Sequence, residues 1–493
     1  MPTISFQSEL RPELPVVDGP KEYREQRALF LRLDELFGFS GIEADFFRFS
    51  MAHRKIDLNQ CTALEVESLS RGCVLALRSN VARMITGMAH RDFCIRLADS
   101  PLLQWFLQIG RVDGVTAFAK STSDRFAHCI DANSINKINA KLIKLLQSDS
   151  GVDWGLDEAL SFEEIFFDST CLKAPIHYPI DWVLLRDATR TLTKSIARIR
   201  KSAQRCRMPK EPLLFFSDMN TLCMKMTAKN RTKEGKKHRK KVFREMKALL
   251  KRVQKHAQRH LDLLKVCGEE TGLSAGVIQN IITQMEGILV QVPAVIKQAH
   301  ERIIGGRKVV NKDKIFSLYD EDVQVIVRGK SNAEVEFGNN LWIGETRSGF
   351  IVDYLLEKEK TSDAKQIEPA IKRLVEEQSL RIKSVCGDRG VHSDANEEML
   401  KSRGIDSWLC PRDVTDLSER LKEEPEFREG LKRRAGIEAR ISIVIRKFMG
   451  TPARAKGFEN REMMVGWAVL SHNLWKLARL KQAEVPEELP QAA

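Results

Sequence analysis

The residue with the strongest claim to chemistry is Asp388, which follows a short apolar segment. Residues 382–389 read Ile-Lys-Ser-Val-Cys-Gly-Asp-Arg, and Gly390 comes next. The apolar residues predict a buried β-strand that ends at the aspartate, and the two glycines allow the backbone to turn sharply. A carboxylate at the carboxyl end of a central strand lies where α/β sheets usually place chemistry. We therefore expect Asp388 to face an opening and not the core.

A second carboxylate, Asp168, follows the apolar run Ile165, Phe166 and Phe167. The run predicts a strand that ends at Asp168 and pairs with a following strand over residues 171–177. Taken alone, Asp168 is explained as readily by a turn or a helix cap, where aspartate is common. Lys173, five residues further on, is a candidate for contact with a phosphate.

A third carboxylate, Glu438, belongs to the helical pattern of residues 431–446, in which positions 434, 438, 441 and 445 share one face. Arg434 lies one turn before Glu438, so a surface ion pair is the plain interpretation. If the three acids converge, their oxygens suit Mg²⁺ or Mn²⁺. Two such ions roughly 3.5–4 Å apart can activate a water or a 3′-hydroxyl for in-line displacement at a phosphodiester.

The elements that must position these acids predict a mixed α/β fold. Strand patterns at residues 315–319, 323–327, 335–337, 341–343 and 350–355 are separated by glycines, and they precede a helix at 363–377 and the Asp388 strand. A helix at 394–402 and a strand at 407–410 follow, which is the order of a layered α/β structure. Helical patterns at 65–126 fit a helix-turn-helix DNA module or an all-α packing domain equally well.

The positive charge of the chain is concentrated in one segment. The net charge is +13, and residues 225–259 alone contain 15 lysines and arginines against Glu234 and Glu245. A solvated helix face is the usual explanation of such a run. The density here, with little aromatic content, favours contact with the phosphates of duplex DNA. The candidate contacts are Lys236, Lys237, Arg239, Lys240 and Lys241.

Other features indicate a soluble protein of the cytoplasm. The ten cysteines show no zinc-binding spacing and are expected to be reduced thiols. The chain begins without a signal pattern, and no apolar run approaches the roughly 20 residues that cross a bilayer. At 493 residues the chain is too long for a single core.

Several motifs resemble those of bacterial insertion-sequence DDE transposases. Residues 167–170 (Phe-Asp-Ser-Thr), with 176–181, resemble the region of the first aspartate, and residues 386–393 (Cys-Gly-Asp-Arg-Gly-Val-His-Ser) resemble that of the second. Residues 434–438 (Arg-Ala-Gly-Ile-Glu) resemble the Arg-x-x-x-Glu helix, residues 466–474 the helix after it, and residues 75–106 the helical N-terminal domain. The resemblance implies an RNase H-like mixed sheet with flanking helices, plus an all-α N-terminal domain and an α-helical insertion.

The same resemblance implies a function and its residues. Asp168, Asp388 and Glu438 would be the catalytic, metal-binding triad, with Mg²⁺ or Mn²⁺ as cofactor. The activity would be cleavage of double-stranded DNA at terminal inverted repeats and strand transfer into target DNA, by a homodimer or larger assembly bound to the bacterial nucleoid. Arg389, Arg434 and Arg446 are further candidate DNA contacts. The related Tyr-x-x-Arg-x-x-x-Glu-x-x-x-x-x-x-Lys signature is incomplete, since Leu431 and Ile445 occupy its tyrosine and lysine positions.

The expected organisation follows from these assignments. We expect an N-terminal arm and helix over 1–60, a DNA-binding or dimerisation domain over 61–150, the first part of the catalytic core over 158–205, a basic insertion over 206–312, the rest of the core over 313–482 and a tail over 483–493. A Gly- and Asp-rich loop at 148–157 marks the first boundary. Two alternatives stay open: a transposase-derived DNA-binding protein without activity, and a nuclease without strand transfer.

Overall fold

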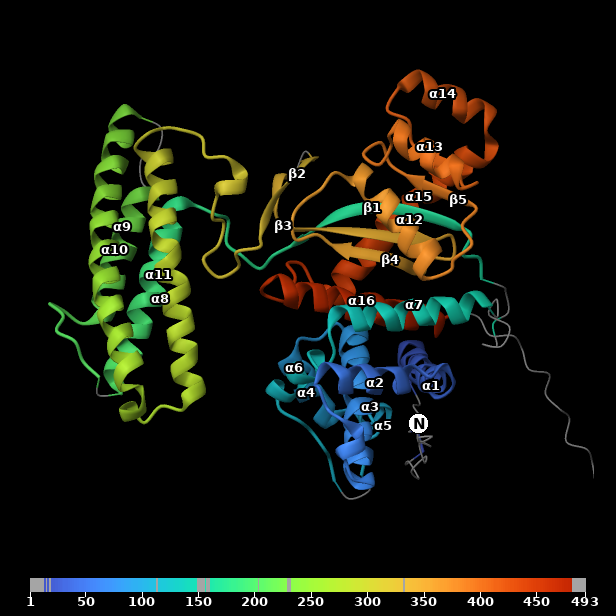
Figure 1. Ribbon diagram of the computed structural model, residues 1–493, viewed down its shortest axis with the longest axis horizontal. Helices are drawn as coiled ribbons and strands as arrows, with labels where there is room; N and C mark the ends of the chain where they lie inside the picture. Colours follow the sequence, from blue (N-terminus) through green and yellow to red (C-terminus); the bar gives the residue numbers. More distant parts are fainter. Residues whose placement is uncertain are drawn as a thin grey trace, which may run out of the picture. The chain divides into compact units, whose positions relative to one another are not determined.

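The structure, a computed structural model, describes residues 13–480 apart from 15, 17–18, 112–113, 149–155, 157–159, 203, 228–231 and 331–332. It divides into two compact units, one of Met1–Pro175 with Asn339–Ala493 and one of Ile176–Gly338 (Figure 1). Outside the described residues lie most of the arm before residue 20, all of the boundary loop at 148–157 except Ser148 and Leu156, the basic residues 229 and 231, and the tail at 483–493.

The first unit begins with helices, as the sequence predicts. They are α1 (Lys21–Ser40), α2 (Ile42–His53), α3 (Ala63–Thr86), α4 (His90–Asp99), α5 (Pro101–Phe106), α6 (Lys120–Ala127) and α7 (Ala132–Ser148). Thr62 and Glu65 cap the start of α3 reciprocally, and Gly87 ends it with a φ of +66°. Ser100 caps α5, so the helices break at both Gly87 and Ser100.

A six-stranded mixed sheet follows, and its residues between 324 and 338 belong to the second unit. Its strands are β1 (Glu164–Lys173), β2 (Gln324–Lys330), β3 (Ala333–Thr346), β4 (Ile351–Leu356), β5 (Ser384–Gly387) and β6 (Asp406–Leu409). The order is β2-β3-β1-β5-β6, with β4 also paired to β3. β1 and β6 both run parallel to β5, whereas β2 and β4 run antiparallel to β3. The mixed α/β prediction is confirmed, and the sheet is consistent with an RNase H-like core.

Three strand predictions were wrong. β1 does not end at Asp168 but continues through buried Cys171 and Leu172 to Lys173, so residues 171–177 form no hairpin partner. Residues 315–319 form no strand; part of this segment packs on the helical core of the second unit. The expected pair 335–337 and 341–343 is the single strand β3, because Gly338 is tolerated within a strand that has partners on its flanks.

Helices cover the sheet and carry the last third of the chain. α12 (Ile367–Lys372), α13 (Asp394–Ser402), α14 (Val414–Glu423), α15 (Pro425–Ile443) and α16 (Phe458–Leu477) follow one another, with a π-helical turn at Val444–Met449 after α15 (Figure 1). The Arg433 guanidinium of α15 lies 5.3 Å from the Phe166 ring centroid of β1. The buried Trp467 of α16 donates its indole N–H to the Ala127 carbonyl, 3.0 Å away.

The second unit is built mainly from four helices: α8 (Asp181–Lys201), α9 (Pro212–Thr227), α10 (Lys233–Cys267) and α11 (Ala275–Ile303). The apolar stripe of α10 is buried in its core and consists of Val242, Met246, Leu249, Leu250 and Val253. Asp181 is the first residue of α8 and pairs with Arg302. None of the described helices combines the length and apolar character that a membrane-spanning segment requires. The ten cysteines are free.

Candidate active site

The pairing of β1 with β5 places Asp168 beside Asp388. The strands run parallel, and Phe166 lies opposite Cys386 in their register. Two residues further along each chain stands an aspartate. Because side chains alternate between faces and neighbouring strands lie about 4.8 Å apart, both aspartates occupy the same face at adjacent positions. Asp388 comes directly after the last residue of β5, so its side chain lies where the ladder opens, as predicted.

Glu438 reaches this face from α15. The helix packs on the sheet through Ile437 and Ile441, which are buried, and Arg433 contacts the ring of Phe166, two residues before Asp168. Glu438 itself is exposed. The helix therefore presents its carboxylate beside the sheet face that carries the two aspartates.

The pKa of Asp168 also reflects its proximity to Asp388 and Glu438. Burial raises the pKa of Asp168 to about 6, the Ser169 N–H and the charge of Arg434 oppose this rise, and the charges of Asp388 and Glu438 add to it. A carboxylate responds in this way only to charges nearby. Asp168, Asp388, Glu438 and Arg434 thus form one electrostatic cluster, although their positions span 271 residues of sequence from 168 to 438.

Backbone groups hold both aspartates in place. One carboxylate oxygen of Asp388 accepts hydrogen bonds from the N–H groups of Gly390 at 2.9 Å and Val391 at 3.2 Å. A Cβ on Gly390 would lie 3.1 Å from that oxygen, so a side chain there would crowd the carboxylate. Asp168 accepts from the Ser169 N–H at 2.8 Å. Each acid is oriented by its own neighbours in the chain.

A fourth carboxylate, Asp363, lies next to this cluster and was not anticipated from the sequence. The Ser169 hydroxyl donates to Asp363 at 2.8 Å. Burial raises the pKa of Asp363, and the charge of Asp388 contributes to the rise. Asp363 starts a short 3₁₀ turn before α12. Its sequence neighbours carry no strand or motif signal, so only the tertiary packing reveals it.

Residues 343–474 match the family model of the transposase DDE domain. This segment, 132 of the 493 residues, is similar to a transposase DDE domain. The matched segment includes Asp388 and Glu438 and begins after Asp168. No curated protein and no solved structure matches the chain. The match supports a transposase function, which implies DNA as the substrate.

The DDE domain fits a divalent metal by the chemistry of its donors. DDE transposases generally use such ions, and the cluster supplies carboxylate oxygens, which hard cations prefer. The mutual repulsion recorded at Asp168 would be relieved by a cation between the acids. In the side-chain conformations of the described residues, however, no three histidine, cysteine or acidic groups are arranged to hold one ion. Asp168, Asp388 and Glu438 are therefore close together, but their side chains do not form a metal coordination shell.

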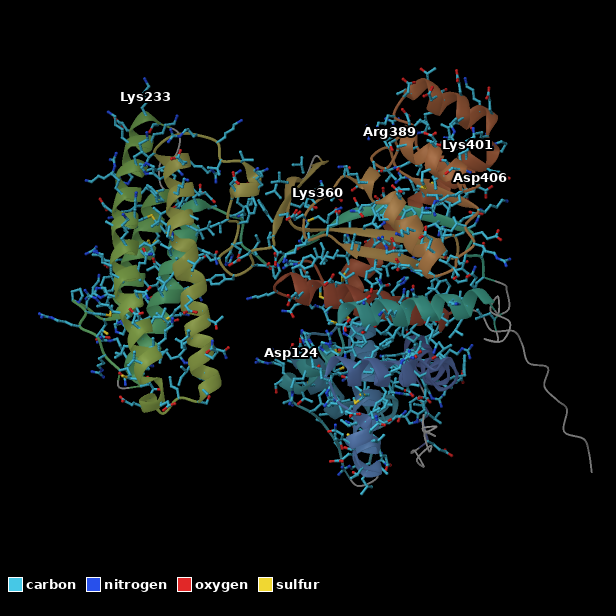
Figure 2. The ribbon with its side chains drawn as sticks, in the orientation of Figure 1. Asp124, Lys233, Lys360, Arg389, Lys401 and Asp406 are labelled. Atoms are coloured by element: carbon cyan, nitrogen blue, oxygen red, sulfur yellow. The ribbon has the colours of Figure 1, made fainter. Side chains whose placement is uncertain are left out.

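The predicted DNA contacts near the DDE cluster differ in their surroundings. Arg389 is exposed in the turn after β5 (Figure 2), and Lys173 is exposed at the end of β1. Arg434 lies in the cluster, and no ion pair joins it to Glu438, although both residues are in the described part of the chain. The surface ion-pair interpretation is therefore wrong. Arg446 is exposed in the π-helical turn.

The lysine position of the incomplete signature is explained by packing. Ile445 is half-buried, and the neighbouring Lys447 places its ammonium 4.2 Å from the centroid of the Trp475 ring. Burial also lowers the pKa of Lys447. Arg446, which is exposed, is thus better placed than Lys447 to contact a DNA phosphate.

The five basic candidates of the second unit lie in the first turns of α10, whose first residue is Lys233 (Figure 2). Lys236, Lys237 and Lys241 are exposed, whereas Arg239 and Lys240 are half-buried. The Arg239 guanidinium lies 4.6 Å from the Trp182 ring centroid, so this arginine is held by a cation–π contact.

Proposed function

We propose that this protein is a DDE transposase that cleaves DNA at the terminal inverted repeats of an insertion sequence and joins the ends to target DNA. The supporting observation is the placement of Asp168 and Asp388 at adjacent positions of parallel strands, with Glu438 presented to the same face by α15. Acids so far apart in sequence gather in this way only through the fold.

Asp168, Asp388 and Glu438 would hold Mg²⁺ or Mn²⁺ in this mechanism. The ions, when bound, supply activation of a water or a 3′-hydroxyl and stabilisation of the leaving oxygen. The protein contributes orientation: the N–H groups of Gly390 and Val391 fix Asp388 through one oxygen, which leaves its other oxygen for a ligand. Asp363 holds Ser169, the residue next to Asp168, through its hydroxyl.

Positive side chains around the cluster would hold the DNA strand that reacts. Arg389 is exposed directly after Asp388, Lys173 is exposed at the end of β1, five residues beyond Asp168, and Arg446 follows the helix of Glu438. Arg434 adds a positive charge inside the cluster. These residues would contact phosphates, which positions the DNA without reading its sequence.

The remaining parts of the chain have proposed roles in binding DNA ends. The helical domain over 61–150 would bind DNA or mediate dimerisation, and the basic insertion over 206–312 would contact the duplex through α10. Residues 176–205, expected in the first part of the core, belong with α10 to the unit of Ile176–Gly338. Because two DNA ends must be joined, we propose a homodimer or larger assembly, acting in the cytoplasm on the nucleoid.

The test uses purified full-length protein and a labelled duplex that carries the inverted repeat found beside its coding region. With Mg²⁺ or Mn²⁺ and a supercoiled target plasmid, we expect strand cleavage at the repeat and joined products. Cleavage without joined products would reveal a nuclease. Specific binding without metal-dependent cleavage would reveal a DNA-binding protein derived from a transposase.

A further inference from the structure

A large cavity in the second unit is lined mainly by positive side chains. It has a volume of about 710 Å³ and lies between the first turns of α10, the end of α11 and the loop after α11. Seven of its fourteen lining residues are lysine or arginine, and Asp181 is the single acid among them. A cavity with this charge excludes cations and attracts anions.

Two acidic groups near the cavity, Asp181 and Glu301, are already engaged. Asp181 pairs with Arg302 at 2.8 Å and accepts a hydrogen bond from Gln298 at 2.9 Å. Glu301 pairs with Arg307. Of the other lining cations, Lys236, Arg239, Lys240 and Lys308 have no acidic partner among the described residues. Most of the positive charge in the cavity is therefore uncompensated.

One detail indicates that the cavity is prepared for a ligand with acceptor oxygens. The Nε–H of Arg239 is buried and has no hydrogen-bond acceptor in the described structure, although the guanidinium is fixed over the ring of Trp182. Unsatisfied buried donors are costly and call for a partner. The lining residues between 302 and 314 come from the end of α11 and from the loop after it, and the charge pattern of the sequence did not single them out.

Side-chain charge, and not the helix dipoles, sets the sign of the cavity. The N-termini of α10 and of α8, whose first residue Asp181 lines the cavity, contribute partial positive charges, and the C-terminus of α11 contributes a partial negative charge. Together these helix ends add only about half a positive charge, far less than the side chains. The seven basic side chains remain as the source of the potential.

We infer that this cavity is a binding site for a phosphate of the DNA backbone. The inference rests on the proposed function for its choice of DNA over a small anion. The exposed Lys233, Lys237 and Lys241 continue the positive surface along α10 beyond the cavity, as an extended polyanion requires and a single small anion does not. Lysines dominate the unpaired set and bind as point charges, so the contact holds the duplex without sequence preference.

The test compares two double variants with the same change of charge. Lys240→Glu with Lys308→Glu alters the cavity, and Lys251→Glu with Lys255→Glu alters exposed residues of the same helix away from it. Binding of the full chain to a mixed-sequence 30-base-pair duplex is measured by fluorescence anisotropy over a salt series. We expect the cavity variant to lose at least tenfold more affinity than its control, with a salt slope lower by about 0.9 for each phosphate that the variant no longer binds.

Equal losses of duplex affinity in the two variants would overturn the inference, since the cavity residues would then contribute no more to DNA binding than other basic residues of α10. A second result would also overturn it. Inorganic phosphate would raise the thermal unfolding midpoint of the unmodified protein but not that of the cavity variant, while the two proteins bound the duplex equally well. A Lys240→Ala, Lys308→Ala variant, which introduces no new charge, repeats the comparison should the glutamates prevent folding. Absence of metal-dependent cleavage alongside the expected binding result would refute the catalytic proposal and leave the cavity assignment standing.

Discussion

At the scale of single residues, the chemistry depends on how each carboxylate is held. Asp388 is fixed by two backbone N–H groups, Asp168 is half-buried with a pKa of about 6, and Glu438 is exposed on its helix. Burial and repulsion between like charges disfavour three ionised acids in one place. A bound cation would offset the repulsion between these carboxylates, which is otherwise unfavourable for the folded protein.

Replacement of Asp388 by asparagine tests the role of the carboxylate at nearly constant shape. The amide can still accept from the N–H groups of Gly390 and Val391, so folding should be retained. We expect cleavage of a repeat-bearing duplex to fall by more than about 100-fold, because even groups that only orient a metal ligand are worth up to about that factor. Affinity for the same duplex, measured by anisotropy, should change less than threefold, and an equal loss of binding would argue against a metal role.

At the scale of elements, α15 positions Glu438 beside the sheet. Gly430 of α15 allows the helix to approach β6 closely. A Cβ at Gly430 would lie 2.5 Å from the indole ring of Trp408 on β6. Gly72, in the middle of α3, has open space at the corresponding position. The two residues therefore separate the cost of crowding from the general effect of a helical glycine.

Gly430→Ala should destabilise the protein by about 1–3 kcal/mol, the usual cost of overpacking a core contact. Gly72→Ala should be neutral or stabilising by up to about 1 kcal/mol, because alanine favours the helix. Urea unfolding of both variants provides the comparison. If Gly430→Ala proved as harmless as Gly72→Ala, the contact between α15 and β6 would be looser than the structure indicates.

The α16 helix is tied to its neighbours by a polar network around His472. Asn473 donates to Asn139 of α7 and to the Ile351 carbonyl of β4, both at 2.8 Å. Arg440 lies 3.4 Å from the His472 Nε2, so this nitrogen must accept and Nδ1–H is free to donate to Asn473. Burial, together with the charge of Arg440, lowers the pKa of His472 to about 3.

This histidine predicts a loss of stability in acid. His472 stays neutral in the folded protein down to about pH 3, whereas the unfolded chain binds a proton below about pH 6.5. The stability contributed is therefore present above pH 6.5 and is lost progressively as the pH falls towards 3. The thermal unfolding midpoint should drop between pH 7 and pH 5, and His472→Gln should flatten that slope. His238→Gln, on the exposed surface of α10, should leave it unchanged.

At the scale of the whole molecule, the two units divide the charge between them. The unit that contains the carboxylate cluster also contains the match to the DDE domain, and the unit of Ile176–Gly338 contains the basic segment. A separate basic unit can supply affinity for any duplex, while the acids act on one phosphodiester. Affinity and chemistry can then be altered independently.

Charge reversal at Lys236, Lys237, Arg239, Lys240 and Lys241 should weaken duplex binding and reduce its dependence on salt. Each phosphate that the variant no longer neutralises should lower the slope of log affinity against log salt by about 0.9. Binding isotherms from 50 to 200 mM salt give this slope. A slope that matched the unmodified protein would mean that the segment is only a solvated surface.

The sequence by itself determined the local features. Asp388 at the end of an apolar strand, the helix breaks at Gly87 and Ser100, the apolar stripe of α10 and the concentration of basic residues all follow from residue type and short-range periodicity, which act within a few residues. These local signals do not depend on contacts with distant parts of the chain.

Only the tertiary structure decided what depends on partners distant in sequence. β1 continues past Asp168 because it lies between β3 and β5, and neither strand is visible in the local pattern of residues 165–168. Asp363 joins the cluster through Ser169, and the basic cavity draws on residues 302–314 as well as on α10. Strand pairing and side-chain packing act across hundreds of residues, so the neighbours of a charged group are set by the fold and not by its sequence context.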